Sequence, residues 1–506
     1  MSEISIAVNR LGLGARPDEP LPGDGKRWAL AQFERYDPRP APVAAAPTRT
    51  AVAGELAQYV QTQKMLRQQG FGRRIEKSSA VVPAPTADGQ AMAPGVAPPA
   101  TPPAPVEPYD PVREARKFVG QQIRTNYMDS VGARAQAALL TPTPFMERLV
   151  HFWSNHFAVS ADKVQVTGMS GLLEFEAIRP HVLGKFSDML VAVETHPAML
   201  LYLDQAQSVG PNSQLSSLLA RRSNGPRKVP GLNENLAREI MELHTLGVRT
   251  GYTQADVTEF ARALTGWSVW GIERGPIDRL VSHDAKVGDF IFAAPLHEPG
   301  ARTIMGKRYA EPGIKQAGQV LADLSVHPAT AEHISTKLAR HFAGDTPPPA
   351  LVARLQATYL RTGGDLPSLY RVLIAAPEVW ADQPVKFKTP WEWTLSAYRG
   401  VGAREIKAQT VTGLLSQLGQ PAWRPGAPAG YDDVAASWAA PDAIMRRVEA
   451  AERFGQRAGN AVDARQIAPK LFPAALTPAT TQALANADSP GQALALLLVA
   501  PEFMRR

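Results

Sequence analysis

The chain has 506 residues, of which 44% are hydrophobic and 20% are charged. This length allows roughly two to four domains, and the composition excludes a wholly disordered, fibrous or coiled-coil protein. There is no cysteine, so disulfides and cysteine nucleophiles are excluded, and any metal would be held by His, Asp, Glu or backbone oxygen. The formal net charge is +7, but the basic clusters are short, so we expect a mildly basic, solvated surface and no specific nucleic-acid binding.

No apolar run approaches the roughly 20 residues that a transmembrane helix requires. The first residues also lack the basic region, apolar stretch and cleavage site of a secretory signal. We therefore expect a cytoplasmic protein, unless a partner carries it out of the cytoplasm.

Composition and periodicity divide the chain into four regions. Residues 1–78 are expected to form an N-terminal helical segment, with helices near 26–36 and 52–69. Residues 79–112 are rich in Pro and Ala, with ten prolines in 81–112. Such a segment cannot bury enough apolar surface to fold, so we predict a disordered linker or insertion. Residues 113–400 are expected to form the main helical core, and residues 401–506 a helical region packed on it.

The core shows mainly the 3.6-residue periodicity of amphipathic helices, so the predicted fold is mainly α. Helices are expected at 113–139, 143–158, 171–191, 233–247, 253–266, 313–326, 329–343, 349–361 and 366–376. Residues 205–232 are polar and predict a surface loop. At about 288–309 two short β-prone stretches flank a Pro- and Gly-containing turn, which predicts one small β-hairpin.

The helix at 143–158 carries the first candidate site. At about 100° per residue, Glu147 and His151 lie close together with Asn155 beside them, whereas His156 lies on the apolar face. The two histidines are five residues apart, so they cannot chelate one metal as an i, i+4 pair does. Either histidine could act as a ligand or an acid–base group, with Asn155 orienting the substrate. The structural alternatives are a surface Glu147–His151 pair and a hydrogen-bonded core His156.

The helix at 233–247 carries the second candidate site. Arg238, Glu239 and Glu242 share one polar stripe next to the inward-facing His244, and two carboxylates three residues apart can share a cation. Arg238 would orient ligands or substrate. The structural alternative is a set of ordinary ion pairs between residues four apart.

Further histidines lie outside these two helices. His297 and the following Glu298 are in the turn of the predicted hairpin, where they could ligate a metal or form an exposed turn. His333 and His341 lie on one predicted helix, and we expect His341 to be buried in the core or in an interface. The tentative metal ligands are therefore Glu239, Glu242, His244 and His297.

These motifs together resemble the bacterial family known as domain of unknown function 1800. The resemblance covers essentially the whole chain except the Pro-rich insertion. Its main segments are Arg10-Leu-Gly-x-Gly-Ala-Arg-Pro17, Glu147-Arg-Leu-Val-x-Phe-Trp-Ser-Asn-His-Phe157, Asn233-Glu-Asn-Leu-Ala-Arg-Glu-x-Met-Glu-Leu-His-Thr-Leu-Gly247, Ala261-Arg-Ala-Leu-Thr-Gly-Trp267 and His297-Glu-x-Gly-x-Arg302. Arg302 stands where relatives usually have Lys, which keeps the cation but changes its geometry.

The resemblance implies a mostly helical bacterial protein. Relatives are often encoded beside a second family, domain of unknown function 1501, whose members look like alkaline phosphatases. Two functions follow as hypotheses. The first is an enzyme that depends on a transition metal or haem bound by the histidines and carboxylates above. The second is a non-enzymatic scaffold or escort for the phosphatase-like partner. The sequence determines neither the substrate nor the oligomeric state.

Overall fold

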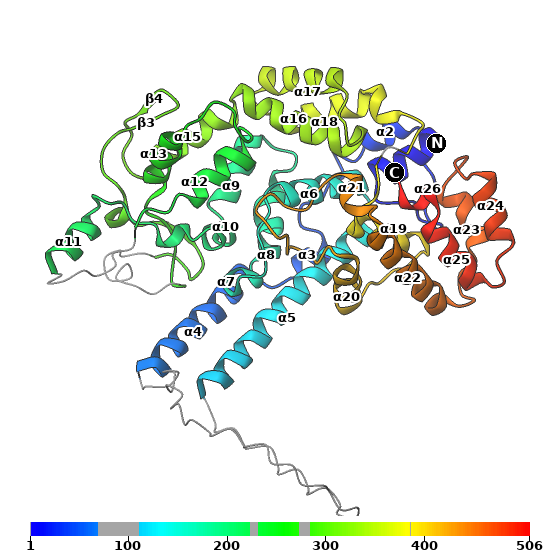
Figure 1. Cartoon of the computed structure of the whole chain (residues 1–506), viewed down its shortest axis with the longest axis horizontal. Helices are drawn as coiled ribbons and strands as arrows, with labels where there is room; N and C mark the ends of the chain where they lie inside the picture. Colours follow the sequence, from blue (N-terminus) through cyan, green and yellow to red (C-terminus); the bar gives the residue numbers. More distant parts are fainter. Residues whose placement is uncertain (1, 69–110, 223–230, 273–283, 385) are drawn as a thin grey trace, which may run out of the picture.

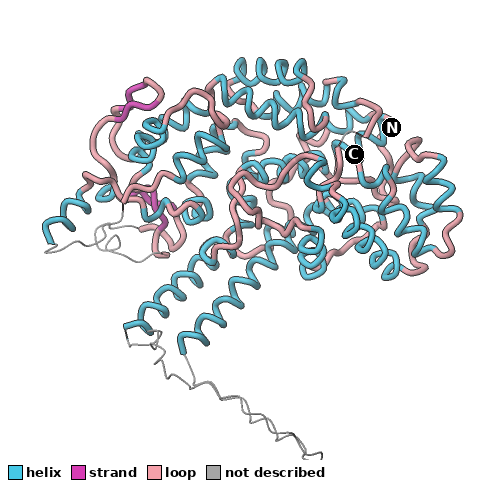
Figure 2. The backbone as a smooth tube through the Cα atoms, viewed as in Figure 1, coloured by secondary structure: helices cyan, strands magenta, loops and turns pink. Residues whose placement is uncertain are grey.

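A computed structural model describes residues 2–68, 111–222, 231–272, 284–384 and 386–506. This part of the chain is mainly helical, as predicted (Figures 1 and 2). Most of the predicted insertion at 79–112 lies outside the described residues, and its last two residues already belong to a helix. Within the described ranges, no helix combines the length and apolarity needed to span a membrane.

The first third of the chain forms a run of helices, in which η denotes a π-helical or 3-10 segment. These elements are α1 (Glu3–Ile6), η1 (Ala7–Leu11), α2 (Gly25–Leu30), α3 (Ala41–Ala44), α4 (Arg49–Gln68), α5 (Pro111–Leu140), α6 (Pro144–His156), α7 (Val164–Thr167), α8 (Ser170–Leu172), η2 (Leu173–Ile178) and η3 (Arg179–His181). Helices α4 and α5 lie side by side and project from the body as a two-helix arm (Figure 1).

The middle third adds a further series of helices. They are α9 (Phe186–Glu194), α10 (Pro197–Tyr202), η4 (Gln205–Gln207), α11 (Gln214–Arg222), α12 (Asn235–Glu239), η5 (Ile240–His244), α13 (Gln254–Leu264), η6 (Ala294–Leu296), α15 (Ile314–Ser325), α16 (Pro328–Ala343), α17 (Pro349–Thr362), α18 (Leu366–Ala375) and η7 (Pro377–Trp380). The C-terminal third consists of α19 (Pro390–Gly400), α20 (Ala408–Leu418), α21 (Ala435–Trp438), α22 (Pro441–Ala458), α23 (Ala464–Leu471), α24 (Pro478–Ala485), α25 (Pro490–Val499) and α26 (Pro501–Met504).

Helix α19 joins two hydrophobic clusters because its opposite faces are both buried. Trp391 and Leu395 pack into a large cluster that extends from Leu11 to Trp423. Trp393 and Ala397 pack into a second cluster formed mainly by α22 to α26. Helix α19 therefore connects the C-terminal helices with the large cluster by being apolar on both sides.

The β structure was predicted at the right place but with the wrong pairing. Strands β2 (Phe290–Phe292) and β3 (Arg302–Ile304) both fall within 288–309, yet they do not pair with each other. Strand β2 instead pairs antiparallel with β1 (Trp267–Val269), and β3 pairs with β4 (Lys307–Tyr309) through a turn at Met305 and Gly306. The β3–β4 pairing is local, because a tight turn joins the two strands. The β1–β2 pairing joins segments that are distant in the sequence, so periodicity cannot identify it.

Two helical predictions also need correction. The expected helix at 171–191 is broken into α8, η2, η3 and α9, with Pro180 at the 3-10 turn that interrupts it. Proline lacks the backbone N–H that a continuous helix requires, so this break has a local cause. Within the expected loop at 205–232, residues 214–222 form helix α11, which packs against η6 through a small apolar cluster that includes Leu215 and Leu296.

Helices α22 and α25 approach closely at two glycines, which generates a prediction about stability. A Cβ atom on Gly455 would lie 2.2 Å from the carbonyl oxygen of Gly491, so Gly455→Ala forces these two helices apart. We expect the free energy of unfolding to fall by about 1–3 kcal/mol. The control is Gly413→Ala in α20, where a Cβ meets nothing within 4 Å and helix propensity favours Ala by up to about 1 kcal/mol. Equal urea midpoints for the two variants would contradict the prediction.

Candidate functional site

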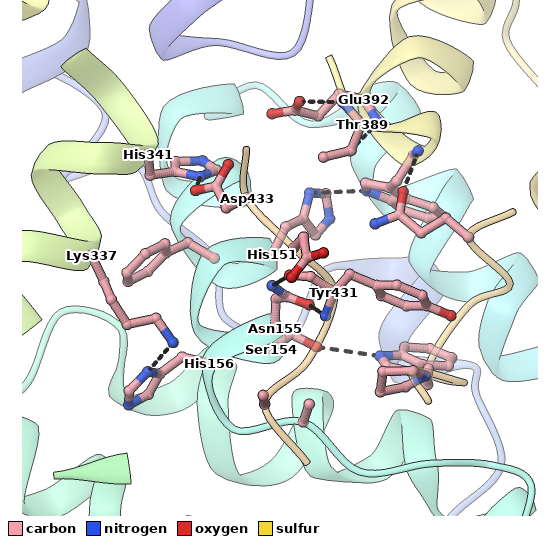
Figure 3. A pocket seen from close by; sticks show the side chains of 18 of the residues that line it. His151, Ser154, Asn155, His156, Lys337, His341, Thr389, Glu392, Tyr431 and Asp433 are labelled. Carbon is pink, nitrogen blue, oxygen red and sulfur yellow. Dashed lines mark hydrogen bonds and ion pairs between the residues drawn. The ribbon is translucent and has the colours of Figure 1, made fainter. Parts of the chain in front are cut away.

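The candidate site is a cavity of about 360 Å³ bounded by α6, α16, α19 and the segment 420–434. Figure 3 shows polar side chains from each of these elements turned toward the same space. Helix α6 lines the cavity with His151, Asn155 and His156. Because almost all of α6 is buried, its polar side chains have to find partners inside the protein.

His151 is largely buried, with 10% of its side chain exposed, and it lies between two protein partners. This finding corrects the alternative of a surface Glu147–His151 pair. Its Nδ1 accepts a hydrogen bond of 3.1 Å from the indole N–H of Trp391. Its Nε2 faces Glu147 at 3.5 Å. Glu147 in turn accepts two hydrogen bonds of 2.7 and 2.8 Å from the Arg179 guanidinium. Both ring nitrogens of His151 therefore point at protein groups.

These surroundings fix the protonation of the pair. Burial raises the pKa of Glu147, but Arg179 and His151 together outweigh burial and hold that pKa well below its usual range. Burial lowers the pKa of His151, and the hydrogen bond to Glu147 only partly offsets this effect. At neutral pH the site thus contains a carboxylate and a neutral imidazole.

His156 is a core histidine, which was the structural alternative for this residue. Its Nε2 donates to the backbone carbonyl of His244 over 3.1 Å, and its Nδ1 accepts from the Nζ of Lys337 over 2.9 Å. Burial and the charge of Lys337 lower the pKa of His156 well below its ordinary value. The ring is therefore neutral, with its proton on Nε2, and neither nitrogen is free to bind a metal or haem iron.

The second predicted site, on α12 and η5, does not assemble as expected. The Nδ1 of His244 lies 2.7 Å from the Oε1 of the buried Glu194 on α9. Arg238 binds Glu242 at 3.2 Å, as in the ion-pair alternative. Glu239 stays half-buried, and burial raises the pKa of its carboxyl group.

His297 belongs to a different part of the fold. Its Nδ1 contacts the carbonyl oxygen of Thr265 at 2.9 Å. The adjacent Glu298 is buried and binds the backbone and side chain of Asn212 at 2.8 and 2.6 Å. These contacts hold the loop before β3 against the start of α11. The turn at 297–298 therefore joins two loops and is largely shielded from solvent. The expectation of an exposed turn at these residues is wrong.

No group of three or more His, Asp or Glu side chains is placed to hold a metal ion in the described ranges. The four tentative ligands Glu239, Glu242, His244 and His297 are therefore not brought together as a metal centre. The residues that do converge are His151, Asn155 and His156, which all line the cavity.

Asn155 fastens the segment 420–434 across α6. Its amide nitrogen donates to the carbonyl of Tyr431 over 2.7 Å, and its amide oxygen accepts from the N–H of Tyr431 over 2.8 Å. Both polar ends of the side chain are thus used by one backbone residue, which supports a positioning role for Asn155 and no direct contact with substrate. Gly430 has a φ of 82° and no room for a Cβ, because that atom would lie 2.2 Å from the Asn155 carbonyl.

A family model described as Protein of unknown function (DUF1800) matches residues 6–505, nearly the whole chain. The chain belongs to this family. No curated protein and no solved structure matches it. Family membership confirms the resemblance in the motifs and leaves the chemistry to be argued from the cavity.

The most informative residues of the cavity were not among the predicted site residues. Helix α16 turns His333, Lys337, Arg340 and His341 toward it, at spacings of four, three and one. Burial lowers the pKa of both His333 and His341 to about 4, so these two rings are neutral at pH 7. The sequence signal for these residues is a polar face at helical spacing on 329–343, which contains two cations beside the two histidines.

Lys337 and Arg340 are the unbalanced charges of the cavity. Among the described residues, neither forms an ion pair with a carboxylate, although Arg340 donates to the backbone carbonyl of Asp345 at 3.3 Å. Burial lowers the pKa of Lys337 to about 8, against the attraction of Asp433. At pH 7 the side chain of Lys337 is therefore still mainly cationic.

Most other charged groups that line the cavity are paired within the protein, whereas the exposed Asp432 has no cationic partner among the described residues. Arg134 binds Glu174 at 2.8 Å. Glu392 is paired with Arg148 and, at 2.9 Å, with Arg506. Further along the wall, Asp433 binds His341 at 2.8 Å and Lys386 at 3.0 Å, and the exposed Asp432 accepts from Ser437 at 2.7 Å. The wall formed by α16 therefore carries the excess positive charge.

The Asn155 clamp generates a prediction for this member of the DUF1800 family. Asn155→Ala leaves the N–H and carbonyl of Tyr431 without their partners, which should cost about 1–3 kcal/mol of unfolding free energy. Amide hydrogen exchange in residues 421–434 should become faster than in the rest of the protein. The control is Asn486→Ala, which removes only an exposed contact with Gln482. Unchanged exchange in 421–434 would show that the clamp does not hold this segment.

Proposed function

We propose that the protein is an enzyme that binds a small organic anion in the cavity between α6, α16 and the segment 420–434. The observation that carries the proposal is that Lys337 and Arg340 on α16 have no carboxylate partner among the described residues. The other two cations that line the cavity, Arg134 and Arg148, are each paired with a glutamate. A cation without a protein counter-ion in a partly desolvated cavity favours an anionic ligand.

The size and composition of the cavity agree with a small-molecule ligand. Its volume of about 360 Å³ lies at the lower end of the range for such pockets, roughly 300–1,000 Å³. Trp391, Trp423 and Tyr431 supply aromatic surface beside the charged wall. A ligand with one anionic group and a short apolar body would match both parts.

Lys337 is the group best suited to proton transfer in this cavity. Its pKa of about 8 lies close to neutral pH, where a group both gives and takes a proton readily. His156 is less suitable because both of its ring nitrogens are hydrogen-bonded. His151 is less suitable because its Nδ1 accepts from Trp391 and its Nε2 faces Glu147. In this proposal they hold Trp391 and Lys337 in place.

This proposal is metal-independent because the predicted ligands do not converge and the central imidazoles are engaged. The metal- or haem-dependent form of the enzyme hypothesis stays a prediction. The escort role for a phosphatase-like partner also stays a prediction, because the contacts in the cavity neither support nor oppose it.

The first test is binding of succinate, benzoate and inorganic phosphate by isothermal titration calorimetry at pH 7. Replacing one charge-assisted hydrogen bond is worth about 1.5–3 kcal/mol, so Arg340→Gln and Lys337→Met should each weaken binding at least about tenfold. The controls are Arg308→Gln and Lys315→Met, which remove exposed cations that do not line the cavity. Loss of binding in a control, or no binding by the wild-type protein, would contradict the proposal.

The second test is the pH dependence of that binding. A bound anion stabilises the ammonium of Lys337, so its pKa is higher in the complex than the value of about 8 in the free protein. The association constant should therefore be constant below pH 8 and fall by up to about tenfold per pH unit above it. The neighbours that contribute to this pKa are Arg340 and Asp433, and His156 and His333 are already neutral near pH 7. Lys337→Met should abolish the fall. A wild-type profile that is flat to pH 10 would contradict the assignment.

A further inference from the structure

The arrangement around Lys337 leaves its amine able to act as a nucleophile. His156 Nε2 carries the ring proton because it donates to the carbonyl of His244, so His156 Nδ1 can only accept. Lys337 is consequently the donor in the 2.9 Å contact with that nitrogen. When the amine is neutral, its lone pair cannot point at His156 and is left for another group in the cavity.

The protein also makes the neutral fraction of this amine larger near physiological pH than that of a lysine in water. Lysine in water has a pKa of about 10.4, whereas burial lowers that of Lys337 to about 8. Arg340 contributes in the same direction, since its charge disfavours a second cation nearby. Desolvation beside another cation is a recognised way of making a lysine nucleophilic.

The position of Arg340 suggests which electrophile would be held against this amine. Residues three apart on a helix are neighbours, with Cβ atoms roughly 5–6 Å from each other. Arg340 can bind a carboxylate through its planar guanidinium. The carbonyl carbon next to that carboxylate would then lie on the side of Lys337.

We propose that Lys337 forms an imine with a 2-oxo acid whose carboxylate is bound by Arg340. This inference rests on the proposed function, because it names the class of organic anion and the bond that the anion forms. Aromatic side chains of the same cavity, among them Trp391 and Trp423, would face the rest of the acid.

The step balances without any further reactant. The Nζ lone pair attacks the carbonyl carbon, a C–N bond forms, and the carbonyl oxygen becomes the hydroxyl group of a carbinolamine. The two hydrogens of the amine leave with that oxygen as one water molecule, and the C=N bond remains. Nothing is oxidised or reduced. His156 Nδ1 holds the amine by one of these hydrogens before the attack.

The test is reductive trapping of the wild-type protein with pyruvate and sodium cyanoborohydride at pH 7.5, followed by peptide mass mapping. We expect one reduced pyruvate adduct on Lys337, formed at least about tenfold faster than on the exposed Lys315, because far more of the Lys337 amine is neutral. Succinate, which has no carbonyl group to react, should slow the labelling of Lys337 and leave that of Lys315 unchanged.

Two variants separate the roles of the cations. Arg340→Gln should reduce labelling at Lys337 about tenfold at low pyruvate concentration and restore most of it at saturation, because the amine itself is intact. Lys337→Arg should give no adduct in the cavity while it still binds succinate, which shows that it is folded.

The possible failures are distinguishable. If succinate binds in the cavity but pyruvate labels Lys337 no faster than Lys315, the imine inference is wrong and the proposed anion-binding function stands. If neither acid binds and neither protects Lys337, both proposals are wrong. Labelling of Lys337 that is unaffected by Arg340→Gln and by succinate would show a reactive amine without the proposed carboxylate site, and would overturn the inference.

Discussion

The buried carboxylate of Glu392 is the interaction on which the geometry of this protein depends most. It is paired with Arg148 on α6 and with Arg506 at the C-terminal end of the sequence, and it also accepts from the backbone N–H of Thr389 in the capping box of α19. Burial raises the pKa of Glu392, but the two guanidiniums outweigh burial and keep the group ionised. A buried charge is tolerated only when it is fully partnered, so these three contacts have to form together.

This one carboxylate positions both the cavity and the C-terminal helices. Helix α6 carries His151, Asn155 and His156, whereas α19 carries Trp391 on one face and contributes Trp393 to the second hydrophobic cluster on the other. The segment before α19 pairs with the last residues of the chain, since Lys386 and Arg506 exchange backbone hydrogen bonds of 3.1 and 2.8 Å. The cavity therefore lies where separate parts of the sequence are joined by a buried ion network.

The sequence predicted the helices well, because amphipathic periodicity and caps are local properties. The Thr253–Asp256 capping box is present with its reciprocal hydrogen bonds, and the helices at 113–139, 329–343 and 349–361 lie within a few residues of α5, α16 and α17. The strand pairing could not be predicted, because β2 takes its partner from a segment before it and not from the adjacent β3.

The candidate site was only partly predictable for a similar reason. The motif on α6 pointed to the correct helix, yet the roles of His151, Asn155 and His156 depend on Trp391, Tyr431 and Lys337, which lie far away in the sequence. The four tentative metal ligands do not converge in the described part of the chain, and His244 contacts Glu194 on another helix. The sequence did not reveal that Lys337 and Arg340 on α16 have no carboxylate partner in the described ranges, because a missing contact has no local sequence pattern.

The most direct test of this account is the titration of Lys337 itself. Competitive acetylation across pH 6–11, read by peptide mass spectrometry, measures the fraction of each lysine that is neutral. The account predicts a midpoint near pH 8 for Lys337, and a shift to higher pH when succinate is present. A midpoint near the value of about 10.4 for a lysine in water, unaffected by succinate, would contradict it.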